Sequence, residues 1–406
     1  YPTFSSLSGA TASYAPQTVY GGTPNILNPQ TIQWSFGIQR DLGKGTIMDV
    51  SYLGWVTHHG FALSGWDLNA VPPFTTWKPT PGPGTNSCGQ VLAYLDPTAP
   101  AVKADCTGGA LLNTNLIRAM TGFDGWQGIN LGTNAGETNY NALQVQFNKR
   151  YGKRLQFGIN YTWSKALSYS PGTNNNNGGG NNQFLDNKLT YNVTNNRPQV
   201  VNVNFGYKLQ NGTSLLPIGA RNYVTKLFFD GWNINGVLSF YSGTAANVDC
   251  GVTGAPLGYW WGTPTDTPSI RCDRSGPVFL NDGTSPGSLG LKTDQRLWYP
   301  FAVQNYSLPG KDSFGLGNVP LTSFYGPGFE NADLSVSKTI TLGAETRTLE
   351  FRAEAFNTLN HFNPGNPNTT LTFNYLTNAQ TNANYGAITG VQNTARHMAL
   401  SLRFRF

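Results

Sequence analysis

The last ten residues of the chain alternate between large apolar side chains and polar or small ones. Every second position is apolar, and these positions are Met398, Leu400, Leu402, Phe404 and Phe406. Because successive side chains of a strand point to opposite faces, this segment predicts a strand with one apolar face and one polar, cationic face. A strand that is apolar outward and polar inward is typical of a membrane β-barrel.

The same alternation recurs eight times earlier in the chain. The segments that show it are 31–41, 46–58, 139–150, 154–167, 198–209, about 232–240, 331–341 and 347–359. Glycine-containing turns separate several neighbouring segments, which is typical of antiparallel hairpins. The sequence therefore predicts an all-β fold, an antiparallel up-and-down transmembrane β-barrel with about nine or more strands.

The connections between these strands alternate between short and long. The longest span about 60–136 and 243–328, whereas three others are tight turns. Bacterial barrels have short periplasmic turns and longer extracellular loops, so we expect the long segments outside, together with a loop at 1–29 that precedes the barrel portion 30–406. Single-chain bacterial barrels have even strand numbers, so nine strands favour a part of a larger barrel.

Composition agrees with this class. Charged residues make up 11% of the 406 residues, well below the ~25% of soluble domains, and aromatic residues make up 13%. No run approaches the ~18 apolar residues of a spanning helix. The net charge of +6 comes from scattered side chains, which gives no nucleic-acid footprint.

The four cysteines fall into two local pairs, each inside a long connection. Cys88 is followed by Cys106, and Cys250 by Cys272, without the spacing of a zinc or redox site. We expect two disulfides that close loops in an oxidising compartment.

Neither a metal site nor a catalytic site emerges from the sequence. His58 and His59 are adjacent, so on a strand they face opposite ways and do not form a metal pair. There is no catalytic Ser/His/Asp pattern and no phosphate-binding glycine loop. We expect no enzyme activity and no cofactor.

Four segments along the chain share a recognisable pattern; they are NPQTIQWSFGIQR at 28–40, YNALQVQFNKR at 140–150, GPGFENADLS at 326–335 and FRAEAFNTLNHFNP at 351–364. In residues and in order, these segments resemble strands of Oar-like TonB-dependent receptors. The resemblance covers 28–406 apart from the two longest loops. It implies an outer-membrane transporter with a regulatory domain, a plug and a 22-stranded barrel, energised through TonB. This chain is similar to the C-terminal part of that barrel alone.

Three groups of residues are candidate sites. The terminal strand resembles the signal that the barrel-assembly machinery reads, through Leu400, Leu402, Phe404 and Phe406; simple lipid contact is the alternative. Inward-facing charges predict an ion-pair ladder, or else a substrate or plug contact, formed by Glu350, Arg352, Glu354, Arg403 and Arg405. Tyr259, Trp260 and Trp261 form an aromatic triplet in an outside loop that could stack on sugars or anchor a peptide; packing within the loop is the alternative.

The function that fits best is passage of polar solutes, such as oligosaccharides or peptides, through a TonB-dependent outer-membrane receptor. The expected partners are outer-membrane lipid, the barrel-assembly machinery, and a plug and TonB complex. A passive porin or surface adhesin is one alternative, and a secreted β-sandwich or fibre-forming protein is another. Dependence on detergent would separate the membrane classes from the last.

Overall fold

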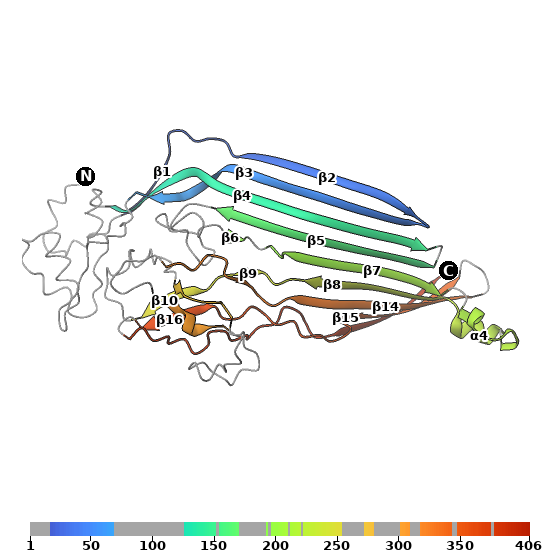
Figure 1. Cartoon of the computed structure of the whole chain (residues 1–406). Coiled ribbons are helices and arrows are strands. Elements are labelled where there is room, and N and C mark those ends of the chain that lie inside the picture. The colour runs from blue at the N-terminus through green and yellow to red at the C-terminus, as the bar shows by residue number, and fades with distance from the viewer. Residues whose placement is uncertain are drawn as a thin grey trace, which may run out of the picture.

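Nine long strands form one large sheet in the computed structural model of the chain (Figure 1). The structure describes residues 17–68, 126–151, 154–169, 192–193, 196–209, 212–220, 222–253, 272–279, 301–308, 317–342, 347–374 and 377–406. The long strands are β2 (Gln30–Gly43), β3 (Thr46–Asp67), β4 (Trp126–Tyr151), β5 (Leu155–Tyr169), β7 (Gln199–Leu209), β8 (Trp232–Tyr241), β14 (Phe329–Thr341), β15 (Thr348–Phe356) and β17 (His397–Arg405).

Each long strand pairs antiparallel with the next one along the chain, from β2 at one edge to β17 at the other. This is the up-and-down order predicted from the alternating connections. Short turns join β2 to β3 and β14 to β15 at one end of the sheet, which we call the turn end. The long connections leave from the opposite end, which we call the loop end. The all-β, antiparallel prediction is confirmed.

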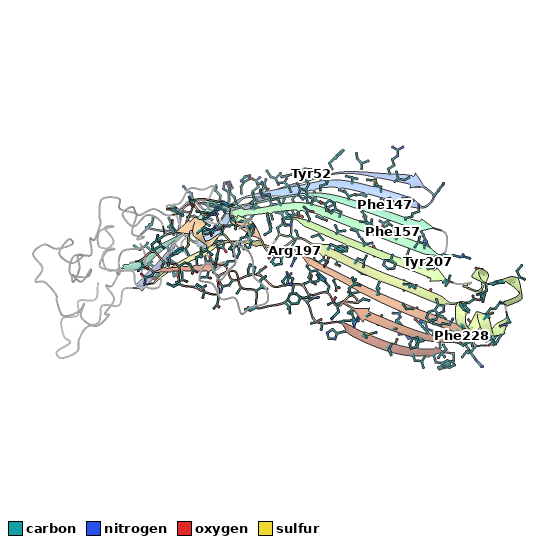
Figure 2. All side chains as sticks on the ribbon, turned by 60° about the horizontal axis from the view of Figure 1, so that its bottom comes forward. Tyr52, Phe147, Phe157, Arg197, Tyr207 and Phe228 are labelled. Carbon is teal, nitrogen blue, oxygen red and sulfur yellow. A yellow bond between two sulfur atoms is a disulfide. The ribbon has the colours of Figure 1, made fainter. Side chains whose placement is uncertain are left out.

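The pairing register separates the side chains into two faces. On one face, apolar residues stand next to one another across successive strands, as in the row Met48, Phe147, Ile159, Val203, Leu238 and Ala332. On the other face, polar residues do the same. Figure 2 shows labelled aromatic residues spread over successive strands of the sheet. Large side chains of the apolar face stay exposed, such as Trp163 at 58% and Leu402 at 69%, as lipid contact requires.

β3 and β4 extend further toward the loop end than the sequence pattern predicted. The expected loop at about 60–136 is shorter, because β3 continues to Asp67 and β4 begins at Trp126. Beyond Thr57 the register shifts repeatedly, and His59 has a positive φ of 58°. The backbones of Gly60 and Gly136 touch there, so a Cβ on either glycine would clash. These bulges break the two-residue period, so alternation could not reveal the continuation.

Short strands occupy parts of the connections at the loop end. β1 (Gln17–Gly22), inside the expected loop 1–29, runs parallel to β4. The others are β6 (Asn192–Val193), β9 (Ala245–Ala246), β10 (Asp249–Thr253), β11 (Asp273–Arg274), β12 (Tyr306–Ser307), β13 (Phe324–Tyr325) and β16 (Thr370–Asn374). β10 pairs parallel with β16, so two connections far apart in sequence meet. We call the structure that these two connections form the loop-end unit.

The best-buried hydrophobic core lies in the loop-end unit, away from the large sheet. Phe301, Leu371 and Tyr385 are nearly or fully inaccessible to solvent, and Phe301 stacks on Tyr385 with ring centroids 4.8 Å apart. The sheet of a barrel has lipid on one side, so its apolar side chains need no protein core. The loop-end unit instead packs its apolar side chains against one another.

The connection between β7 and β8 is helical. It contains η2 (Gly212–Leu215), η3 (Ile218–Ala220) and α4 (Tyr223–Phe229), and a further 3-10 turn, η5 (Val303–Asn305), lies at the loop end. Figure 1 shows α4 projecting at the turn end, near the C-terminus. None of the helices in the described segments has the length and apolar character of a membrane span.

Candidate functional site

The polar face of the sheet is the first candidate site. One row of side chains crosses seven strands without an apolar member, and it contains Gln39, Asp49, Gln146, Asn160, Asn202, Ser239 and Asn331. Asn202 Oδ1 accepts hydrogen bonds from Ser239 Oγ at 3.1 Å and from Tyr241 Oη at 3.0 Å. Amide and hydroxyl groups both donate and accept, so this face can hydrogen-bond to neutral polar solutes or to another polar protein surface.

Five charged residues of the polar face stand on the neighbouring strands β15 and β17. Arg352 lies 3.5 Å from Glu350 and 3.3 Å from Glu354, both measured between guanidinium nitrogen and carboxylate oxygen. Arg405 Nη2 lies 3.9 Å from the other oxygen of Glu350. Arg403 is the register neighbour of Glu350. In the described residues, however, the β17 side chain that comes within 4.0 Å of the Glu350 carboxylate is Arg405. The structure thus brings four of the five predicted ladder residues into one network.

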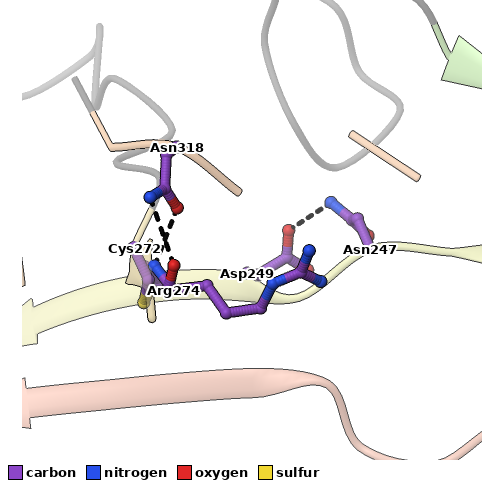
Figure 3. The surroundings of a disulfide bond; sticks show 6 residues. Asn247, Asp249, Cys272, Arg274 and Asn318 are labelled. Atoms are coloured by element: carbon purple, nitrogen blue, oxygen red, sulfur yellow. Dashed lines mark hydrogen bonds between the residues drawn. A yellow bond between two sulfur atoms is a disulfide. The ribbon is translucent and has the colours of Figure 1, made fainter. Parts of the chain in front are cut away.

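A disulfide joins Cys250, on β10, to Cys272, beside β11. Cys272 is fully buried in the core of the loop-end unit, and Figure 3 shows it beside Arg274 and Asn318. Asn318 pairs with the backbone of Arg274 next to it, donating to the carbonyl oxygen at 3.2 Å and accepting from the amide at 2.7 Å. Because 259–261 lies between the two cysteines in sequence, the disulfide ties both ends of the segment with the aromatic triplet to the folded unit. Tyr259, Trp260, Trp261, Cys88 and Cys106 themselves lie outside the described residues.

Burial shifts the ionisation of three groups in the loop-end unit. It raises the pKa of the Asp249 carboxyl from 3.8 to about 6, and a hydrogen bond from Asn247 Nδ2, 2.7 Å away, opposes the rise. Burial likewise raises the pKa of the Tyr306 and Tyr385 hydroxyls. These tyrosines are therefore neutral core residues at physiological pH.

A groove of about 540 Å³ opens at the loop end, where β7, β8 and β14 end. His361 Nε2 and Glu330 Oε1, which lie 2.8 Å apart, are part of its lining together with Phe240 and Pro364. Arg197 ties the nearby connections together: it donates to Ser242 O at 2.9 Å and to Gln392 Oε1 at 3.2 Å. Figure 2 places Arg197 toward the loop-end part of the sheet.

The sequence patterns did not single out Glu330 and His361 of the groove, or Arg197 near it. Glu330 and His361 lie inside two of the segments that carry the family resemblance, and their place in those segments was the signal that the sequence offered. Arg197 directly precedes the predicted strand 198–209, so it is not part of the alternation of apolar and polar residues there. Three-dimensional closure of the connections, which periodicity does not encode, brings these residues together.

The terminal strand presents its large apolar residues on the outward face. Leu400 is 69% exposed and Phe406 is 94% exposed, and Phe404 stacks on Phe406 with centroids 6.1 Å apart. Such a face is open to lipid and to other proteins alike. No cluster of three potential metal-binding side chains occurs in the parts of the chain that the structure describes.

Two solved outer membrane transporters and one protein family are similar to this chain. A search of curated proteins found no match. Among solved structures, the outer membrane transporter YddB from Escherichia coli aligns with 96% of this chain at 10% identity and a TM-score of 0.37, and the FrpB iron transporter from Neisseria meningitidis aligns with 95% at 10% identity and a TM-score of 0.36. The chain covers 34% and 32% of those two chains, about a third of each.

The sequence profile of one family matches nearly the whole chain, over residues 1–399. Its description, outer membrane beta barrel domain, agrees with the two-faced sheet and with an outer-membrane location. The chain belongs to the outer membrane beta barrel domain family.

Proposed function

We propose that this chain is the C-terminal barrel segment of a TonB-dependent outer-membrane transporter for polar solutes such as oligosaccharides or peptides. The observation that carries the proposal is the uninterrupted row of polar side chains across seven strands, from Gln39 to Asn331, on the face opposite the apolar one. In a barrel of this class the polar face lines the interior, where it contacts solute, water or a plug.

The chemistry of the row favours neutral polar cargo. Amides and hydroxyls make up six of its seven members, the seventh being Asp49. On β15 and β17, four charged residues pair with one another in the network around Arg352 and Glu350. A solute that exchanges hydrogen bonds with many similar groups binds weakly at each and moves on, whereas fixed unpaired charges would retain an opposite charge.

The loop-end unit supplies the proposed capture element. We assign the loop end to the cell exterior, because long loops are extracellular in bacterial barrels. The Cys250–Cys272 disulfide anchors the segment containing Tyr259, Trp260 and Trp261 on a rigid core. Tyrosine and tryptophan rings offer an apolar surface with a polar group, which suits the faces of sugar rings or apolar peptide side chains.

The proposal is tested by solute uptake in cells that make the whole gene product. Fluorescently labelled maltodextrins and oligopeptides serve as probes, in a host with TonB and in one without it. Uptake that requires both the gene and TonB supports the proposal. Uptake that requires the gene but not TonB indicates a passive porin and overturns the energised mechanism, and no gene-dependent uptake of either probe overturns the assigned solute class.

Two matched variants locate the path. Asn160→Leu with Asn202→Leu makes two of the seven positions in the polar row apolar, while Val203→Leu is a conservative change on the opposite face of β7, the strand of Asn202. Uptake should fall several-fold in the first variant and stay unchanged in the second, with equal amounts of folded protein in the outer membrane. Equal uptake in both would show that the polar face does not line the path.

A further inference from the structure

The helical connection at the turn end carries an unusual amount of exposed apolar surface. In α4, Tyr223 is 77% exposed, Phe228 is 63% exposed and Val224 is 58% exposed, and Ile218 just before the helix is 83% exposed. The segment lies beyond the strand ends, where tight turns would serve to connect β7 and β8. A solvated connection of this kind is normally polar, so these side chains call for a partner.

α4 gathers four of its five apolar residues on one side, and its start is well defined. At about 100° per residue, Tyr223, Val224, Leu227 and Phe228 fall within a roughly 140° arc, whereas Thr225, Lys226 and the last residue, Phe229, lie on the other side. Asn222 and Thr225 form a reciprocal capping box: each side chain bonds the other residue's backbone amide at 2.9 Å. The apolar arc is therefore presented by a formed helix rather than by a fluctuating turn.

Two residues of the sheet's apolar face hold the C-terminal end of α4. Trp232 Nε1 donates to the carbonyl oxygen of Phe228 at 2.7 Å. Lys338 Nζ donates to the same carbonyl at 3.4 Å and to the carbonyl oxygen of Asp230, and it stands 4.9 Å from the Trp232 ring centroid. An ammonium group at the C-terminal carbonyls of a helix also opposes the negative end of its dipole.

Through Trp232 and Lys338, α4 is connected with the lipid-facing surface. Trp232, Lys338, Phe351 and Leu402 are register neighbours in one row of the apolar face. That row crosses the sheet near the turn end, and it includes an aromatic residue, Trp232, and a cation, Lys338, the kinds of side chain that populate the membrane–water boundary. On the other side, Asp230 accepts from the backbone amide of Thr213 at 2.8 Å, which joins η2 to the same assembly.

We propose that the described residues 212–220 and 222–230 form an interfacial anchor that lies on the phospholipid leaflet at the turn end of the barrel. The apolar arc of α4 enters the boundary between headgroups and acyl chains, and Lys226, opposite it, faces the water and the phosphates. Helices with this pattern lie in the plane of the interface, with the apolar side a few ångströms deep. The inference concerns membrane contact and does not depend on what the barrel transports.

Site-specific photo-crosslinking in intact outer membranes tests the proposal. Benzoylphenylalanine replaces Phe228 in the full gene product, and adducts are identified by mass after illumination. Lys226, on the opposite side of the same helix, is the matched control position, and Phe351, exposed on the lipid-facing row, is the positive control. Because each position is exposed, the replacement leaves folding intact, and a heat-modifiable gel shift verifies this.

We expect phospholipid adducts at Phe228 and Phe351, several-fold above those at Lys226. Adducts of Phe228 with a periplasmic protein would overturn the lipid assignment and identify α4 as a protein docking site. Lipopolysaccharide adducts would place the helix at the other leaflet and overturn the assignment too. Equal lipid labelling at Phe228 and Lys226 would exclude the oriented helix.

Discussion

The side-chain amide of Asn363 pairs with the backbone of Glu330 in both directions. Asn363 Nδ2 donates to the Glu330 carbonyl oxygen, and Asn363 Oδ1 accepts from the Glu330 amide, both at 2.8 Å. The β14–β15 pairing has ended by then, since its last register pair toward the loop end is Leu334 with Ala355. One buried side chain therefore continues the hydrogen bonding of β14 where its neighbouring strand has turned away.

Replacement of Asn363 by alanine should weaken the loop end of β14. Asn363 is 1% exposed, so its loss leaves two backbone groups without partners in a dry position, at a cost of about 2–4 kcal/mol. Hydrogen exchange at Glu330 and its neighbours should accelerate, while the turn-end half of β14 stays protected. Asn366→Ala, an exposed asparagine three residues later, is the control and should have little effect. Equal acceleration in both variants would contradict the bridging role.

The strand positions were predictable because the two environments of a barrel impose a period of two on each strand. Because lipid lies on one side and a polar interior on the other, a single segment such as 154–167 or 397–406 shows the alternation by itself, without knowledge of the strands that pair with it. The order of strands followed from the connection lengths. Where bulges interrupt the period, as at His59 and Gly60, the prediction ended too early.

The loop-end unit was not predictable by the same reasoning. Its core combines residues from two distant connections, such as Val248 with Leu371 and Tyr385, and short irregular segments carry no period. Only the cysteines gave a local signal, because their spacing suggested the pair Cys250 and Cys272. Likewise, the apolar arc of α4 spans too few residues to distinguish a helix from a turn by pattern.

Loss of the disulfide should destabilise the loop-end unit by about 3 kcal/mol, as expected for a loop closed over a separation of 22 residues. The variant is Cys250→Ala with Cys272→Ala, since alanine avoids placing a hydroxyl in the core. Hydrogen exchange in β10 and β16 should accelerate by about a hundredfold, because each factor of ten corresponds to 1.36 kcal/mol. The central strands of the sheet serve as the internal reference. Unchanged protection of β10 would show that packing alone fixes the unit.

Stability of the loop-end unit should depend on pH through Asp249. Its pKa rises from 3.8 to about 6 on folding, so the charged form is disfavoured in the folded state. Well below pH 3.8 the carboxyl is protonated in both states and costs nothing. As the pH rises from 3.8 to 6 the stability falls, and above pH 6 the full cost of about 2 kcal/mol applies, after allowance for solvent screening.

Asp249→Asn removes this titration and can keep the hydrogen bond from Asn247. At pH 7 the amides of β10 should exchange more slowly in the variant, after correction for intrinsic rates, and the difference should shrink as the pH falls to 4 and disappear well below the unfolded pKa of 3.8. A variant that is less protected than the parent at pH 7 would show that the ionised carboxylate stabilises the unit.

The ladder residues should contribute little to stability under physiological conditions. Arg352, with 44% of its side chain exposed, makes two ion pairs, and exposed pairs are worth about 0.2–1 kcal/mol each. Arg352→Gln should accelerate exchange in β15 only a few-fold, and 1 M salt should abolish the difference through screening. Lys208→Gln, which removes an exposed cation without such an ion pair in the described part of the chain, should show neither effect. A large, salt-independent loss would mean that Arg352 is held by something other than its two carboxylates.

The aromatic triplet should govern solute capture without affecting folding, if capture takes place as proposed. Trp260→Ala with Trp261→Ala removes two stacking surfaces, each worth about 0.5–1.5 kcal/mol, so the apparent affinity for a captured oligosaccharide or peptide should fall about tenfold. Tyr325→Ala, at another exposed aromatic of the loop end, is the control. Because the disulfide anchors the triplet's segment, reduction of Cys250–Cys272 in the parent should lower the affinity in the same direction. The measurement is equilibrium binding of the labelled solutes to cells that display the protein. If the tryptophan variant binds them as tightly as the parent does, capture takes place elsewhere on the loop end. The groove beside His361 and Glu330 is then the next site to alter.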